Sequence, residues 1–126
     1  MTLTEKIFVL KSIAPFNNLT DQELIITANI TQEKSYKDGD LIYTNGNALY
    51  SLYIIANGEL TSKNEKQIVG FFGFNELVVD EVINEDICAK GNVTMLLISK
   101  AHLLTLIYES PSIMIEFLSL KEGADA

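Results

Sequence analysis

The sequence predicts an α+β fold that is mainly β, in which a closed β-barrel or jelly roll follows two N-terminal helices and precedes a C-terminal helical segment. Three patterns support it: helix-start motifs before residue 31, short β-branched and aromatic runs between glycine turns over about 31–99, and apolar positions at helical spacing over about 100–121. With 126 residues, 48% of them hydrophobic, the chain suits a single domain with its own core.

Two N-terminal helices are predicted from their capping motifs. Thr2 and Glu5 have the spacing of a capping box, in which each side chain accepts a hydrogen bond from the backbone of the other residue. Pro15 stops this first helix. Thr20 and Glu23 repeat the capping box at the start of the second. The predicted ranges are about 3–14 and 21–30.

Short strands alternate with glycine turns through the middle of the chain. Asn57-Gly58 is the strongest hairpin motif, because a type I′ turn needs positive φ at both central positions. It predicts that Tyr50–Ala56 and Glu59–Ser62 are two separate, paired strands. The other predicted strands are Leu41–Thr44, Gln67–Phe72 after a turn at Lys63–Lys66, and Asp86–Lys90 and Val93–Ile98 on either side of Gly91-Asn92.

Apolar side chains nearly surround the last predicted helix, which begins after Ser110-Pro111. A helix of this kind must be buried on more than one side. Docking against its own barrel is one explanation, and the sharper hypothesis is that one face meets a partner, most simply the same helix in a second copy. The residues predicted for this dimer or partner surface are Ile113, Met114, Phe117, Leu118 and Leu120.

The charge balance excludes several classes of function. All nine basic residues are lysines, against 17 acidic residues, and the net charge is −8. Without arginine no guanidinium can grip a phosphate or carboxylate, and the acidic excess argues against nucleic-acid binding. The apolar runs are too short to span a membrane. The single cysteine, Cys88, excludes an internal disulfide and favours a reducing, cytoplasmic setting.

Catalytic and metal sites are not expected. A cupin-like metal enzyme, the third class considered, needs two or three histidines, and the chain has only His102. Cys88 lacks a second candidate base, so a catalytic nucleophile is not indicated. The acids between Glu76 and Asp86 lack the glycine and ligand spacing of an EF-hand. The prediction is a non-enzyme without metal or cofactor.

Several segments follow one another in the order of a known family's motifs. In chain order, Leu10–Leu24 matches "L-k-x-i-p-l-F-x-x-L-s-d-e-e-l", Tyr36–Tyr43 matches "y-x-x-G-e-x-I-f", and Ser51–Leu60 matches "l-Y-i-I-x-x-G-x-v". On these segments the chain resembles the cyclic-nucleotide-binding domains. The resemblance implies an eight-stranded jelly roll, or double-stranded β-helix, and a regulatory role in signalling.

The resemblance also implies where a ligand would bind. Binding members carry a phosphate-binding cassette after an F-G-E motif, with a short helix whose amides face the cyclic phosphate and an arginine that pairs with it. Here Phe72-Gly73 is followed by Phe74, and Ile87-Cys88-Ala89 occupies the place of R-[ST]-A. The vestigial cassette is therefore expected at Phe72, Gly73, Phe74, Asn75, Glu76, Leu77, Val78 and Ala89.

Five acidic residues near the expected cassette should weaken phosphate binding further than the loss of the arginine alone. A carboxylate and a phosphate about 4 Å apart repel by roughly 1 kcal/mol in water and about 4 kcal/mol at a partly buried site. We therefore expect poor cyclic-nucleotide binding and a domain that acts through protein interaction or dimerisation. The alternative is a true small-ligand sensor, for cAMP, cGMP or a neutral or cationic molecule, whose ligand moves the C-terminal helix. The five acids are Glu76, Asp80, Glu81, Glu85 and Asp86.

Overall fold

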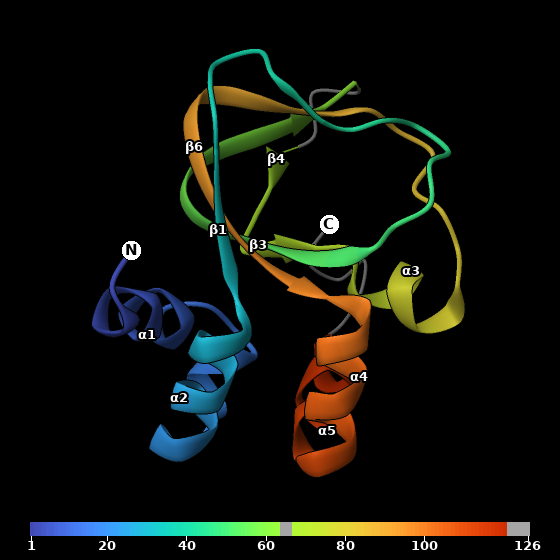
Figure 1. Ribbon diagram of the computed structural model, residues 1–126. Coiled ribbons are helices and arrows are strands. Elements are labelled where there is room, and N and C mark those ends of the chain that lie inside the picture. The colour runs from blue at the N-terminus through green and yellow to red at the C-terminus, as the bar shows by residue number, and fades with distance from the viewer. Residues whose placement is uncertain (64–66, 121–126) are drawn as a thin grey trace. The chain divides into compact units, whose positions relative to one another are not determined.

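The computed structural model describes residues 1–63 and 67–120, which form an α+β fold (Figure 1). The chain divides into two compact units. The helical unit consists of Met1–Ile30 and the described residues from Ala101 onward, and the strand unit is Thr31–Lys100. No helix among the described residues is long and apolar enough to cross a membrane.

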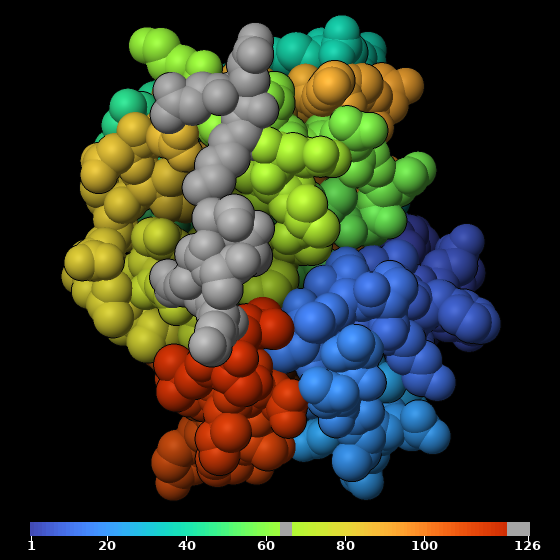
Figure 2. Space-filling view, turned by 180° about the vertical axis from the view of Figure 1, so that it is seen from behind, coloured from blue at the N-terminus to red at the C-terminus, as the bar shows by residue number. Residues whose placement is uncertain are grey.

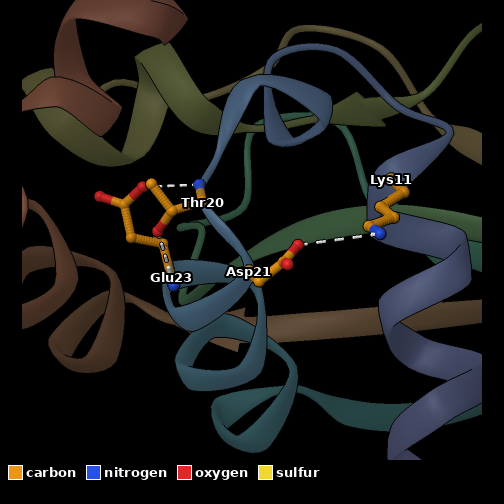
Figure 3. Close-up of polar contacts among 4 residues, drawn as sticks. All are labelled: Lys11, Thr20, Asp21 and Glu23. Carbon is orange, nitrogen blue, oxygen red and sulfur yellow. Dashed lines mark hydrogen bonds and ion pairs between the residues drawn. The ribbon is translucent and has the colours of Figure 1, made fainter.

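Both predicted capping boxes are present in the helical unit. The backbone N–H of Thr2 donates to Glu5 Oε1 at 2.7 Å, and that of Glu5 donates to Thr2 Oγ1 at 3.1 Å. Figure 3 shows the same exchange between Thr20 and Glu23, at 2.9 and 3.1 Å. The helices are α1 (Leu3–Lys11), the short 3₁₀ helix η1 (Phe16–Asn18), α2 (Asp21–Ile30), α4 (Lys100–Glu109) and α5 (Ser112–Ser119).

Helix α1 ends three residues before its predicted limit. Ser12 ends the helix by bonding back to Val9 O, through its backbone N–H at 3.0 Å and its hydroxyl at 2.7 Å. In the last turn of α1, Lys11 Nζ lies 3.8 Å from Asp21 Oδ1 at the start of α2 (Figure 3). The Asp21 side chain is 92% exposed, so this ion pair contributes little to stability.

Helix α5 packs within the helical unit through residues that were predicted to meet a partner. The ring of Phe117 meets that of Phe16 edge to face, with centroids 5.4 Å apart. Asn18 Nδ2 donates to Glu116 Oε2 at 2.8 Å. Figure 2 shows α5, in red, directly against the blue N-terminal residues. Because Phe117 and Ile113 are buried and Met114 is half-buried, the exposed apolar surface of this segment consists of Ile115 (65% exposed), Leu118 (68%) and Leu120 (37%).

The strand unit is built on one antiparallel sheet of six strands, in which two long strands form the centre (Figure 1). The strand β6 pairs with β1, β2 and β3, and β3 also pairs with β4 and β5. The strands are β1 (Gln32–Tyr36), β2 (Leu41–Tyr43), β3 (Ser51–Ser62), β4 (Gln67–Ile68), β5 (Phe71–Phe72) and β6 (Ile87–Ser99).

The hairpin predicted at Asn57-Gly58 is wrong. Strand β3 continues through this dipeptide, and its register with β6 shifts on either side of Asn57. Gly58 has φ +99°, as in a bulge, and a Cβ there would lie 2.5 Å from Asn92 O. The two glycine motifs, at Gly58 and Gly91, therefore form one shared bend of two paired strands.

Five of the six described strands come from the six predicted ones, and the sixth, β1, was not predicted. Two pairs of predicted strands merge into β3 and β6, whereas Gln67–Phe72 is divided into β4 and β5 around Gly70, which has φ +82°. The described residues thus form six strands where the family resemblance implies eight. Residues 64–66 of the turn predicted at Lys63–Lys66 lie outside the described part of the chain.

Alternation along β3 and β6 divides the core between two faces. Leu52, Ile54, Leu96 and Ile98 have no exposed surface and lie on one face. The residues of the other face, called here the inner face, join a cluster consisting of Ile42, Tyr43, Leu60, Phe72, Ile87, Ala89, Val93 and Met95.

Candidate functional site

A short helix lies where the resemblance places the cassette. Helix α3 (Phe74–Val79) follows Gly73, whose φ of +97° is the left-handed conformation that favours glycine. The Leu77 N–H donates to Gly73 O at 3.0 Å and starts the helix. Asp80, with φ +60°, ends it by donating its backbone N–H to Glu76 O. With six residues, α3 is too short to build much of a helix dipole.

Burial divides the residues predicted for the cassette. Phe74 (4% exposed) and Leu77 (2%) anchor α3 in the core, whereas Asn75 and Glu76 are half-buried and Val78 is exposed. Phe72 and Ala89 belong to the inner-face cluster, so the structure does bring them together. Ala89 is 3% exposed, however, and as a residue of β6 opposite Leu60 it has little surface to offer a ligand.

The residue that the resemblance aligns with the family's arginine belongs to the core. Ile87 is 2% exposed and lies in β6 opposite Tyr43 of β2 and Ser62 of β3. An apolar side chain at this position fills the inner face and offers no hydrogen bond to a phosphate. The neighbouring Ser62 hydroxyl is buried and finds no hydrogen-bond partner among the described residues.

The loop between α3 and β6 is fastened to the turn that follows β2. The Tyr43 hydroxyl accepts a hydrogen bond from Ile83 N–H at 3.0 Å and lies within donating distance of Asn47 O and Ile83 O. Gly46 N–H donates to Ile83 O at 2.9 Å, and Asn45 N–H donates to Asp86 Oδ1 at 2.7 Å. The acid Asp86 therefore has a structural partner.

One base approaches the acids that lie between Glu76 and Asp86. Lys100 Nζ lies 3.7 Å from Asp80 Oδ1. Lys100 reaches this place at the end of β6, where its N–H donates to Tyr50 O at 2.9 Å. Twenty residues separate the pair in sequence, so local spacing could not reveal it. Glu76 and Glu81 form no ion pair with any residue of the described chain.

Other reactive residues do not gather into a site. No group of three or more His, Cys, Asp and Glu side chains within the described ranges could hold a metal ion. Cys88 is half-buried in β6, opposite Leu41 and Thr61, and His102 is exposed on α4. A shallow, open depression lies elsewhere, at the β1–β6 pair, and is lined by Ser35, Tyr36, Lys37, Asn92, Val93 and Thr94.

Comparison with known proteins relies on the fold. No protein-family model matches the sequence, and no curated protein matches it. The regulatory domain of Toxoplasma gondii PKA, in co-crystal with cAMP, superimposes with a TM-score of 0.76 at 16% identity, over 94% of this chain and 50% of that one. The CBD2 of PKAR bound to Sp-2Cl-cAMPS gives 0.73 at 18% identity, over 90% and 85%.

The Catabolite Activator Protein of Thermus thermophilus gives a TM-score of 0.71 at 21% identity, over 83% of this chain and 55% of that chain. This chain thus spans about half of the Toxoplasma and Thermus chains. The ligands and roles of those proteins are their own, and identities this low carry over the architecture alone. The chain has the fold of the cyclic-nucleotide-binding domains.

Proposed function

We propose that this chain is a non-catalytic regulatory domain that binds cyclic nucleotide poorly and acts through a protein partner or a second copy of itself. The observation that carries the proposal is Ile87, buried at 2% exposure where binding members of the fold family have their arginine. The proposal treats both compact units as one jelly-roll domain of cytoplasmic signalling type.

The site offers little to a cyclic phosphate. A charge-assisted hydrogen bond contributes about 1.5–3 kcal/mol, and a guanidinium normally supplies two. Lys100, which approaches the residue that ends α3, already faces Asp80. Half-buried Glu76, without an ion-pair partner in the described chain, would repel the phosphate further. Together these losses weaken binding by several powers of ten.

Calorimetric titration with cAMP and with cGMP tests this part of the proposal. The Toxoplasma regulatory domain, which was co-crystallised with cAMP, serves as the positive control. We expect no saturable heat for this chain at ligand concentrations that saturate the control. Saturable binding at low micromolar concentration would overturn the proposal and support the sensor alternative, which the position of α3 after Gly73 favours.

The partner surface is proposed for the exposed side of α5. Leu118 and Ile115 lie three residues apart and on one side of the helix, opposite the buried Phe117. Two copies of a chain with net charge −8 repel each other, so self-association should strengthen as salt screens the charge.

Sedimentation velocity at micromolar concentration tests the surface. We expect a dimer that becomes a monomer in Leu118→Glu, because a carboxylate would be buried in the interface. Gln22→Glu adds the same charge at an exposed position of α2, outside the proposed surface, and should leave the dimer intact. A monomer at every concentration and salt level would refute self-association and leave a different protein as the partner.

A further inference from the structure

One side of the sheet carries an ammonium group among aromatic rings. In β1, Lys34 lies opposite Met95 and Tyr36 lies opposite Val93, both of β6. In β3, Tyr53 lies opposite Leu97 of β6 and Phe72 of β5. Since alternate residues of a strand share a face, these side chains all belong to the inner face. They are called here the aromatic cluster: Lys34, Tyr36, Tyr53 and Phe72.

The rings of the aromatic cluster are held in defined positions. Tyr53 and Phe72 are stacked, with centroids 4.6 Å apart and planes inclined by 7°. Lys34 Nζ lies 5.4 Å from the centroid of the Tyr36 ring, within the range of a cation–π contact. Tyr36 and Tyr53 both pack partly buried against the inner-face core. The cluster is therefore a structured surface that keeps some access to solvent.

The phenol groups of the cluster remain hydrogen-bond donors at neutral pH. Burial raises the pKa of the Tyr36 hydroxyl, and the nearby Asp40 carboxylate raises it further. Burial likewise raises the pKa of Tyr53, and the Tyr36 hydroxyl adds to this, while the Lys34 ammonium acts in the opposite direction.

Lys34 is left without a carboxylate in a chain that has an excess of them. The chain has 17 acids and nine lysines, yet Lys34 forms no ion pair with any residue of the described chain. Its ammonium lies instead over the ring of Tyr36, a residue that lines the open depression. A single ammonium with phenol donors suits a monoanion, and flat rings suit a planar apolar group.

We propose that the aromatic cluster binds a small aromatic carboxylate, whose carboxylate meets Lys34 and a phenol hydroxyl and whose ring packs against the Tyr53–Phe72 stack. This site shares Phe72 with the cassette predicted around α3 but differs from it in chemistry, because it uses Lys34 and Tyr36 of β1 and recognises a carboxylate instead of a cyclic phosphate. It extends the proposed function without depending on it.

Titration of the isotope-labelled full chain with benzoate, followed by NMR, tests the site. We expect saturable shifts confined to Lys34, Tyr36, Tyr53, Phe72 and their strand neighbours. A ligand of this size at a partly open site should bind with a Kd of about 1 mM. Benzamide keeps the ring without the charge, and acetate keeps the charge without the ring. Each should bind at least about tenfold more weakly.

Matched lysine variants separate recognition from general charge. Lys34→Gln should weaken benzoate binding about tenfold, the value of one charge-assisted hydrogen bond. Lys90→Gln removes the same charge from an exposed lysine that pairs with Glu59, and should leave the affinity unchanged. Shifts that do not saturate, shifts scattered over many lysines, or equal affinity of Lys34→Gln and the parent chain would each overturn the proposal. Cyclic-nucleotide binding at Gly73 would refute the proposed function and leave this inference intact.

Discussion

Replacement of Gly58 by alanine tests the shared bend of β3 and β6. Gly58 has φ +99°, and a Cβ there would lie 2.5 Å from Asn92 O and 3.0 Å from Val93 Cα, both backbone atoms that cannot rotate away. A non-glycine residue at positive φ costs about 1–2 kcal/mol, and forcing two packed strands apart costs roughly a further 1–3 kcal/mol. We therefore expect Gly58→Ala to lower the free energy of unfolding by about 3 kcal/mol.

Gly46→Ala is the matched control for the bend. Gly46 has φ +82°, but nothing lies within 4 Å of its added Cβ, so only the conformational cost of about 1–2 kcal/mol applies. Urea unfolding monitored by circular dichroism measures both variants, with an unchanged m value as the check on comparability. If Asn57-Gly58 were an open hairpin turn, the two substitutions would cost the same. A difference below about 0.5 kcal/mol would refute the close approach of the two strands.

Three further substitutions test local contacts of the fold. Tyr43→Phe removes the hydroxyl that accepts from Ile83 N–H and should cost about 1–2 kcal/mol, with faster amide exchange at Ile83; unchanged exchange would contradict the anchored loop. Thr20→Ala breaks the capping box of α2 and should lower the free energy of unfolding, measured in urea, by about 1 kcal/mol. An unchanged free energy of unfolding would show that the box does not form in solution. The hydrogen bonds from Thr2 lower the pKa of the Glu5 carboxyl below 4.5. The stabilisation of α1 by the Glu5 carboxylate is therefore complete above pH 4.5 and is lost as the pH falls through the lowered pKa. Glu5→Gln should remove that pH dependence from the helical circular dichroism signal. If the variant and the parent chain gave the same pH profile, the role of the Glu5 carboxylate in α1 would be contradicted.

Local signals predicted the parts of the fold that depend on neighbours in sequence. The capping boxes at Thr2 and Thr20 are confirmed because every group involved lies within three residues. The hairpin at Asn57-Gly58 is wrong because a positive φ serves a turn or a bulge equally well. The bulge forms because the backbone of Asn92 packs closely against Gly58. Asn92 lies more than thirty residues away in sequence, so the local dipeptide could not reveal this contact.

For the candidate site around α3, the sequence predicted which residue types are present, but it did not predict which of them contact each other. The absence of arginine and the acids after Gly73 can be read from the sequence, and the structure adds that Ile87 is buried. That Asp80 faces Lys100 depends on where β6 ends, and no local pattern encodes it. The aromatic cluster was missed for the same reason, because register alone brings Lys34 near Tyr53 across β6.

The central claim, that α3 and its surroundings do not hold a cyclic phosphate, is tested most directly at the backbone amides of Gly73, Phe74, Asn75 and Glu76. Titration of the labelled chain with cAMP and cGMP, followed by amide chemical shifts, monitors these groups individually. Because Ile87 is buried and no guanidinium is present, these amide signals should stay in place up to millimolar ligand. Saturable shifts of these four amides at low micromolar ligand would contradict the account.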